Sequence, residues 1–333
     1  MHSKILNKLV IAFFLFFVYQ ADAQEMGAFL PFDSIVKSQQ IEVTRAIVSS
    51  LSHESFQGRN MRDGSIELTK NFIENFLKKH QIKPLIGGIY RNKFKFDQNF
   101  LAENIVGVID NIKPKNEYIV LCANYDHLGI TDNFEGTNDY VYNGANDNAT
   151  GCAALMQMAQ FLARFKFTNK VLIVFFAGKH EGNYGAGYFA DYAKRNNVNI
   201  KAVINFEMLG RPFQDQKGKV YMNDNELSNL SFEINYALRE KFIVEKMESH
   251  EDDIFEVEPK QDHIPFYNLY GIPANTISTF DPHTDTIYMT TKDDEKSIDF
   301  VNLHQIINKM TYAVYHILYH NTEIKTEAKK EEE

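Results

Sequence analysis

The segment FFAGKHEGNYG, residues 175–185, places three ionisable side chains directly after an apolar run. Lys179, His180 and Glu181 follow one another without a spacer. Histidine and glutamate are common zinc ligands and general bases, whereas lysine acts as a base only where its pKa is lowered. The segment therefore raises the question of whether these residues hold a metal ion.

Polar side chains gather at four further points of the chain. Taken singly, each has a structural explanation, because an Asp in a turn usually caps a helix and a lone His beside a strand usually makes an ordinary hydrogen bond. Their coincidence favours a metal site, since Asp, His and Glu are the zinc ligands of hydrolases. The residues are Asn124, Asp126 and His127 in LCANYDHLG, Asp147 in NGANDNATG, Glu207 in INFEMLGR, and His283 and Asp285 in FDPHTDT.

The elements that position these side chains alternate along the chain. Strand-like apolar runs and helical periodicity predict a parallel or mixed sheet covered on both faces. In such folds ligands bind beyond the carboxyl ends of the strands, where most of these polar residues fall. We predict a three-layer α/β/α sandwich with a mixed, mostly parallel central sheet, formed by one domain. Predicted strands cover 103–110, 117–123, 170–177, 201–206 and 271–279; predicted helices cover 65–80, 149–165, 185–195 and 296–320.

The N-terminus is typical of a signal peptide over residues 1–23. Lys4 and Lys8 precede the apolar run LVIAFFLFFV, and Ala21 and Ala23 fit the small-x-small cleavage rule. An uncleaved anchor is the alternative, but ten apolar residues are short of the ~20 that a membrane helix needs. We expect export to the periplasm or the exterior, with no stable membrane insertion after cleavage.

Composition indicates which partners, tail and cysteine chemistry to expect of the predicted mature domain, residues 24–321. The formal net charge of -9 and the absence of a basic stripe argue against nucleic acid as a partner. Residues 322–333 are highly charged and are predicted to form a disordered tail. Cys122 and Cys152 lie in apolar settings and are expected to be buried thiols, although their pairing stays open.

The order of these motifs resembles the zinc aminopeptidases of metallopeptidase family twenty-eight, which also contains the glutaminyl cyclases. The likeness runs from about residue 50 to 320 and covers nearly the whole predicted domain. It rests on LSHESFQGRNMRDGSIELTKNFIENFLKKHQIKP, NIVGVID, EYIVLCANYDHLG, NGANDNATGCAALMQMA, INFEMLGR, DHIPFYNLYGIPA and the His283 segment.

The resemblance implies two zinc ions that share Asp147, with a cis peptide bond between Asp147 and Asn148. Each remaining role is carried over by position. Residue 180 and His283 would complete one zinc site, and residues 124 and 207 the other. Position 179 would be the general base, and Asp126 would orient position 124. Asp262 and His263 would either border the cleft or take part in plain loop packing, and both interpretations stay open.

The chain departs from the family pattern at four of these positions. Asn124 replaces His, Lys179 and His180 replace two Glu, and Glu207 replaces the usual Asp. The family's carboxylates carry −4 against the +4 of two zinc ions. Here Asp147 and Glu207 carry −2 and a protonated Lys179 returns +1, which leaves −1. Two dications about 3.5–4 Å apart need more negative charge than this, so a two-zinc centre is disfavoured and Asn124 and Glu207 remain only weak ligand positions.

One zinc ion or none remains open. Asp147, His180 and His283 form a three-ligand set with a free fourth position. Alternatively, the Lys179 ammonium fills the place of a metal and pairs with Asp147 or Glu207.

The chemistry is affected more than the metal site. A lysine with a pKa of about 10.4 cannot take a proton from bound water at neutral pH unless burial lowers that pKa to about 7–8. Glu181 is a candidate displaced base, although a helix start at 181–185 would turn it away.

Three functions stay open on this basis. The first is a pseudopeptidase or weakly active protein that binds peptide N-termini or a small ligand, with Asp147 and Glu207 on the α-ammonium group. The alternative is an active one-zinc exopeptidase or amide-processing enzyme with a non-standard base. Glutaminyl cyclisation is disfavoured, because the chain has no Trp and lacks the Glu base. A structural envelope protein that keeps only the scaffold is the third.

Overall fold

The computed structural model describes residues 28–327, apart from 86, 99, 111–115, 132–138 and 245–260. The predicted signal peptide, residues 1–23, and the end of the predicted tail, residues 328–333, lie outside the described residues.

In the described part of the chain, the main sheet has nine strands, in the order β1-β3-β7-β4-β8-β11-β9-β10, with β2 paired to β3. Strands β7, β4, β8 and β11 run parallel to their neighbours in this series, whereas β3 runs antiparallel to β7. The strands are β1 (Lys83–Pro84), β2 (Arg91–Lys95), β3 (Leu101–Ile109), β4 (Glu117–Asn124), β7 (Lys170–Phe176), β8 (Asn199–Glu207), β9 (Val220–Met222), β10 (Ile243–Val244) and β11 (Ala274–Ser278), and a separate pair is β5 (Gly129–Ile130) with β6 (Val141–Tyr142).

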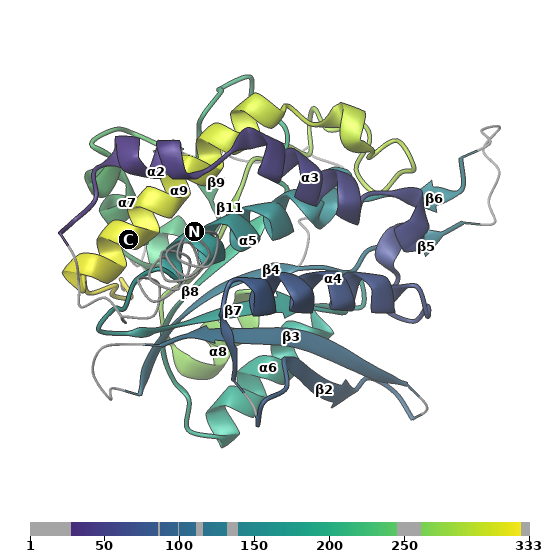
Figure 1. Cartoon of the computed structure of the whole chain (residues 1–333), viewed down its shortest axis with the longest axis horizontal. Coiled ribbons are helices and arrows are strands. Elements are labelled where there is room, and N and C mark those ends of the chain that lie inside the picture. Colours follow the sequence, from purple (N-terminus) through teal and green to yellow (C-terminus); the bar gives the residue numbers. More distant parts are fainter. Residues whose placement is uncertain are drawn as a thin grey trace, which may run out of the picture.

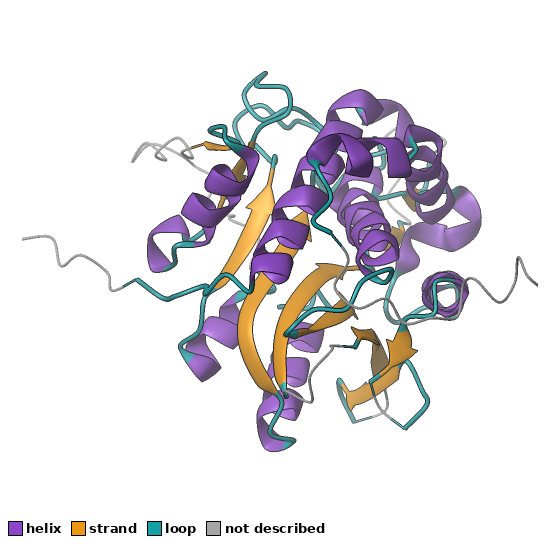
Figure 2. Cartoon of the chain, turned by 60° about the vertical axis from the view of Figure 1, so that its left-hand side comes forward, coloured by secondary structure: helices purple, strands orange, loops and turns teal. Residues whose placement is uncertain are grey.

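Helices cover both faces of this sheet (Figures 1 and 2). Helices α3, α4, α5 and α9 lie on one face, and α6 and α8 lie on the other. The longer helices are α2 (Phe32–Ser38), α3 (Ile41–Leu51), α4 (Ile66–Lys79), α5 (Gly151–Leu162), α6 (Tyr184–Arg195), α7 (Leu230–Leu238), α8 (Ile264–Tyr270) and α9 (Phe300–His320), and the short helical turns are η1 (Glu54–Arg59), η2 (Ala145–Thr150), η3 (Asn225–Leu227) and η4 (Glu295–Ser297).

Alternate side chains of the central strands pack into two separate hydrophobic cores, one on each face of the sheet. On β7, Ile173 and Phe175 pack into the core under α5 and α9, whereas Leu172, Val174 and Phe176 pack toward α6 and α8. Because successive strand residues point to opposite faces, a strand buried on both faces must be apolar throughout. The continuous apolar run at 170–177 therefore reflects burial in the middle layer, as predicted.

The two cysteines are buried and free. Cys122 belongs to the core on the α6 face, whereas Cys152 of α5 belongs to the core on the opposite face. Their positions in different layers agree with the expected buried thiols.

Residues 322–327 differ from the predicted disordered tail. Thr326 forms a β-bridge with Ser228, and the backbone N–H of Glu327 donates to the Leu227 carbonyl at 2.9 Å. Main-chain hydrogen bonding thus fixes this charged segment although it has almost no apolar side chains.

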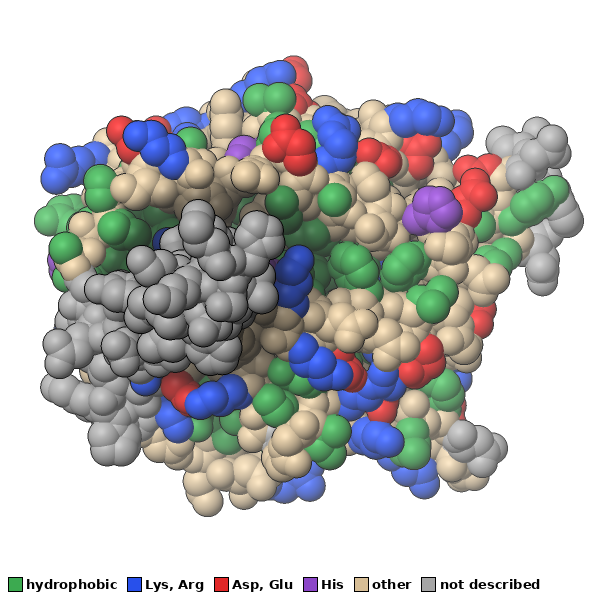
Figure 3. Space-filling model, in the orientation of Figure 1, with side chains coloured by type: hydrophobic (Ala, Val, Ile, Leu, Met, Phe, Trp, Pro, Cys, Tyr) green, Lys and Arg blue, Asp and Glu red, His purple; other side chains and the backbone are tan. Residues whose placement is uncertain are grey.

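The surface seen in Figure 3 carries charges of both signs. Lys and Arg side chains alternate with Asp and Glu over the face seen in Figure 3 and form no basic stripe there. Among the helices that the structure describes, none has the length and apolar character required to span a bilayer.

The start of α9 provides a test of the local structure. The Asp299 carboxylate accepts a hydrogen bond from the Asn302 backbone N–H at 3.0 Å. We expect Asp299→Ala to lower the free energy of unfolding by about 1 kcal/mol, because the first turn loses its cap. Asp299→Asn should retain most of the stability, since Asn caps helices as well as Asp does. Urea denaturation of both variants checks this, and equal losses would show that the ion pair with Lys217 matters instead.

Candidate metal centre

The carboxyl ends of three neighbouring strands and one turn bring the candidate residues together. Strand β4 ends at Asn124, β8 ends at Glu207, and β7 leads directly into the segment with Lys179 and His180. The turn η2, which carries Asp147, precedes α5 and lies against the end of β8. The peptide bond between Asp147 and Asn148 is cis, as the family resemblance implied.

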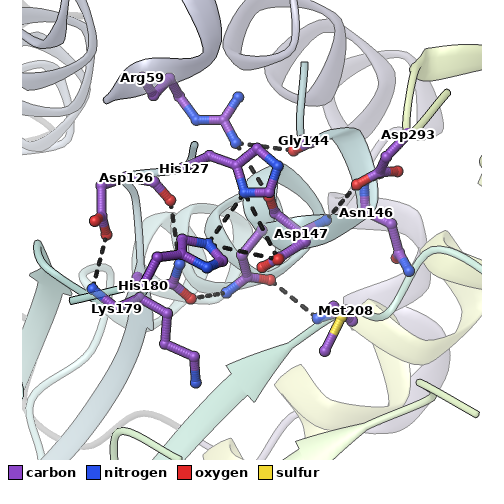
Figure 4. Close-up of polar contacts among 12 residues, drawn as sticks. Arg59, Asp126, His127, Gly144, Asn146, Asp147, Lys179, His180, Met208 and Asp293 are labelled. Carbon is purple, nitrogen blue, oxygen red and sulfur yellow. Dashed lines mark hydrogen bonds and ion pairs between the residues drawn. The ribbon is translucent and has the colours of Figure 1, made fainter. Parts of the chain in front are cut away.

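Three of these side chains point toward one another (Figure 4). His127 Nδ1 lies 3.1 Å from His180 Nε2. Each of these nitrogens lies 3.6 Å from the Asp147 carboxylate oxygen Oδ2. Among the described residues, these three form the one group whose His, Asp, Glu or Cys ligand atoms are close enough to hold a metal ion together.

The surroundings keep the two imidazoles neutral. Burial lowers the pKa of His127 well below its usual value, and the positive charges of His180 and Arg59 add to this effect. Burial also lowers the pKa of His180, although the Asp126 carboxylate opposes the shift. A neutral imidazole has a free lone pair, which is the form that binds metals.

Asp147 is in an environment that disfavours its negative charge. Burial, together with the charges of Glu207 and Asp293, raises the pKa of Asp147 to about 8. Both of its carboxylate oxygens are buried and find no hydrogen-bond partner within the described part of the chain. Buried carboxylates are normally paired or coordinate a metal. The residues present therefore fit a single divalent cation, bound by Asp147 and the two imidazoles.

Lys179 forms a buried ion pair beside this group. Its ammonium Nζ lies 2.9 Å from Glu207 Oε2, and the two side chains are only 4% and 1% exposed. Burial alone would lower the pKa of Lys179, but the negative charges of Glu207, Asp262 and Asp147 outweigh this and raise it. The ammonium is thus the stable form, and the pairing with Glu207 is one of the two that the sequence suggested.

Asn124 and Asp126 have different roles from those carried over by resemblance. Asn124 Oδ1 accepts a hydrogen bond from Asn148 Nδ2 at 2.8 Å, which engages the oxygen that a metal would need. The Asp126 carboxylate accepts from the backbone N–H groups of Gly178 and Lys179, at 2.8 and 3.4 Å. The Asp126 carboxylate therefore positions the segment that carries His180, and it is the Asp126 carbonyl oxygen that accepts a hydrogen bond from Asn124 Nδ2, at 3.3 Å.

Glu181 and His283 do not join the group. Glu181 is exposed and its carboxylate pairs with Arg62 at 3.2 Å, as expected if the start of α6 turns it outward. His283 is also exposed, on the loop after β11, where its backbone N–H donates to Asp281. The structure thus places His127, and not His283, beside Asp147 and His180. Asp285 pairs with Arg211 and accepts from two backbone N–H groups, which fixes this loop.

Asp262 and His263 are both fully buried. Both ring nitrogens of His263 are engaged, Nδ1 with Thr276 and Nε2 with Asp224, each at 2.8 Å. This supports the structural interpretation of His263. Neither carboxylate oxygen of Asp262 has a hydrogen-bond partner among the described residues, and burial raises its pKa to about 7 although the Lys179 ammonium opposes the shift.

Arg59 holds the loops that carry the metal-ligand candidates, and sequence analysis missed this role. Its guanidinium is buried and donates to the backbone carbonyls of Leu51, Tyr125, Asn143 and Gly144 at 2.6–3.0 Å. Figure 4 shows the contact with Gly144. A more distant contact reaches the Asp147 carbonyl at 3.4 Å. One side chain therefore fixes the chain just before His127 and just before Asp147.

Asp293 supports the same turn from the other side. Its carboxylate accepts from the backbone N–H groups of Asn146 and Asp147, both at 2.9 Å. The contact between Asp293 and Asp147 spans 146 residues, so no local sequence pattern predicts it. The only hint in the sequence is that Asp293 lies near the family-like C-terminal motif.

The sequence matches Peptidase family M28 over residues 104–314, which is more than half of the chain. The chain belongs to this family, and the recognition from the order of the motifs is confirmed.

Individual relatives agree with this assignment. Aminopeptidase YwaD of Bacillus subtilis (strain 168) is 25% identical over 247 residues, which are 70% of this chain and 49% of that protein. The chain thus matches about half the length of this relative. LapB of Legionella pneumophila has a similar structure, with a TM-score of 0.69 at 15% identity over 88% of this chain and 76% of LapB. The glutaminyl cyclase of Porphyromonas gingivalis has a TM-score of 0.65 at 15% identity, over 85% and 99% of the two chains. These solved structures confirm the predicted fold class.

Replacement of Arg59 tests its role in the two loops. We expect Arg59→Met to lower the free energy of unfolding by about 3–5 kcal/mol, because several buried carbonyls lose their donor together. Arg62→Met is the matched control, since Arg62 is exposed and its guanidinium makes surface ion pairs with Asp97 and Glu181 and a contact with the Phe96 ring, none of which involves a buried carbonyl. Urea denaturation of both variants measures the difference, and equal effects would rule out the special role of Arg59.

The raised pKa of Asp262 predicts a pH-dependent stability. Its folded-state pKa of about 7 exceeds the ordinary value of 3.8, so the stability it contributes is complete below pH 3.8 and is lost as the pH rises through 7. We expect the free energy of unfolding to fall by ~3 kcal/mol more between pH 5 and pH 8 in the parent than in Asp262→Asn. Asp215→Asn, in an exposed loop, should retain the slope of the parent. Identical slopes in the parent and Asp262→Asn would contradict the assignment.

Proposed function

We propose that this M28 family protein binds a ligand at the site of its relatives' chemistry without efficient cleavage of peptide bonds. The ligand class is a peptide N-terminus or a small molecule that carries an amine. The protein is a pseudopeptidase in this proposal, exported by the segment at residues 1–23.

The ion pair between Lys179 and Glu207 is the observation that carries the proposal. In the family pattern, position 179 takes a proton from water and returns it to the leaving amine. A proton acceptor at neutral pH must be largely unprotonated or have a pKa near 7. The carboxylates around Lys179 raise its pKa, so the residue at this position is a proton donor held by Glu207.

Unpaired acceptors support the binding of an ammonium group. Glu207 Oε1 and both Asp262 oxygens are buried and lack hydrogen-bond partners among the described residues. Burial, together with the charges of Asp147 and Glu207, raises the pKa of Tyr288, whose ring lies 4.7 Å from that of Phe280. An anionic lining beside aromatic rings is suited to an amine next to an apolar side chain.

An active one-metal hydrolase is the second candidate, and the environment of Asp262 favours it. A carboxyl group with a pKa of about 7 is matched to proton transfer at neutral pH. A bound zinc ion would supply polarisation of a carbonyl group or of water. In this alternative Asp262 is the base, and Asp262→Asn would abolish turnover.

Turnover of a panel of aminoacyl amides by the parent and by variants at positions 179 and 180 tests the proposal. We expect the parent to remain close to the uncatalysed rate. The double variant Lys179→Glu with His180→Glu should gain activity, because it restores a carboxylate base and a carboxylate ligand.

Lys179→Gln is the matched control, since it removes the ammonium without adding a base, and it should gain nothing. Circular dichroism and thermal unfolding verify that each variant is folded. If the parent cleaves the amides rapidly and Lys179→Glu abolishes this cleavage, the pseudopeptidase proposal is wrong.

A further inference from the structure

One acceptor atom at each position that a second metal ion would need is already engaged. Asn124 Oδ1 accepts from Asn148, and Glu207 Oε2 accepts from Lys179, so that of the oxygens on these two side chains only Glu207 Oε1 lacks a hydrogen-bond partner among the described residues. Asp147 keeps two carboxylate oxygens that lack a hydrogen bond within the described residues. One cation near Asp147, away from Glu207, is the arrangement that these contacts leave available.

We propose that the protein binds one zinc ion on a ligand set that includes His127 in place of His283. The ligand atoms are His127 Nδ1, His180 Nε2 and Asp147 Oδ2. This site goes beyond the proposed function, because it makes no assumption about turnover. It moves the metal toward the loop after β4, which contributes His127 although Asn124 occupies the usual position.

The geometry of the three atoms fits zinc. Their separations are 3.1, 3.6 and 3.6 Å. Ligand atoms at 2.0–2.1 Å from a tetrahedral zinc ion lie about 3.3–3.4 Å apart, which is close to the mean of these separations. The three atoms therefore form one face of a tetrahedron, and the fourth position is left for water or a ligand.

The ligand chemistry selects the kind of metal. Two imidazoles with one carboxylate suit zinc and other first-row transition metals. Magnesium and calcium prefer oxygen ligands throughout, so this set should discriminate against them.

The His127 ring is held in place by the main chain around it. The backbone N–H of His127 donates to the Arg59 carbonyl at 3.0 Å, and His127 forms a β-bridge with Asn60. Gly144 closes the other side, because a Cβ there would lie 2.5 Å from His127 Cδ2 and 2.4 Å from the Asp147 carbonyl oxygen. These contacts hold His127 and the Asp147 turn at a fixed separation before any ion binds.

Metal titration of the full mature chain tests the site. After removal of metal with a chelator, equilibrium dialysis against zinc should give one ion per chain. We expect His127→Ala and His180→Ala each to weaken zinc binding by on the order of 100-fold or more. His283→Ala is the matched control and should bind zinc as tightly as the parent.

Two further measurements keep the test decisive if a buried variant unfolds. His127→Gln is the milder replacement, and thermal unfolding without metal identifies any variant that has lost its fold. The visible spectrum of the cobalt-loaded parent should indicate four-coordination and should change in His127→Gln but not in His283→Ala. If no zinc binds, or if zinc binding depends on His283 and not on His127, the proposal is overturned.

The same experiment separates this site from the proposed function. One zinc ion bound through His127 together with rapid amide cleavage would leave the site standing and defeat the pseudopeptidase. If the protein neither binds zinc nor cleaves the amides, the zinc site is overturned and the pseudopeptidase proposal stands.

Discussion

A buried lysine keeps its charge only while an anion stays beside it, and this constraint organises the centre of the molecule. Lys179 Nζ lies 2.9 Å from Glu207 Oε2 at the end of β8, with both side chains shielded from solvent. Removing one partner of such a pair leaves an uncompensated buried charge, which typically costs about 3–5 kcal/mol. Glu207 is therefore committed to the ammonium. A second cation at the same carboxylate would have to displace Lys179.

The loops around this ion pair are held in place by a dense set of contacts to their main chain. Arg59 binds the carbonyls that precede His127 and Asp147, and Asp293 binds the N–H groups of the Asp147 turn from the opposite side. The guanidinium supplies donors and the carboxylate supplies acceptors to the backbone of the turn, which departs from helical geometry at Asp147 and Asn148. A site held in this way is preorganised, and its ligand geometry does not depend on a bound ion.

Sequence reasoning predicted the scaffold better than the contacts within it. Alternating apolar strands and helices identify the layers, and the rule that ligands gather at strand ends locates Lys179 and Glu207 together. The position of His127, rather than His283, beside Asp147 and His180 was not predictable. It depends on loop conformations that are set by residues far away in the chain. The surroundings of Asp262 stayed open for the same reason, because a local motif does not show how deeply the folded chain buries a side chain.

Charge balance explains why the site suits one divalent ion. With all groups ionised, Asp147, Glu207 and Asp262 carry −3 and Lys179 returns +1, so the four side chains carry −2. One dication neutralises this charge, whereas two would leave an excess of +2 in a region with little water to screen it. Without any ion, burial and the neighbouring carboxylates raise the pKa values of Asp147 and Asp262 to about 8 and about 7, so that protons replace part of the missing positive charge. Metal and protons thus compete for the same negative charge, and any zinc that binds must release protons as it does so.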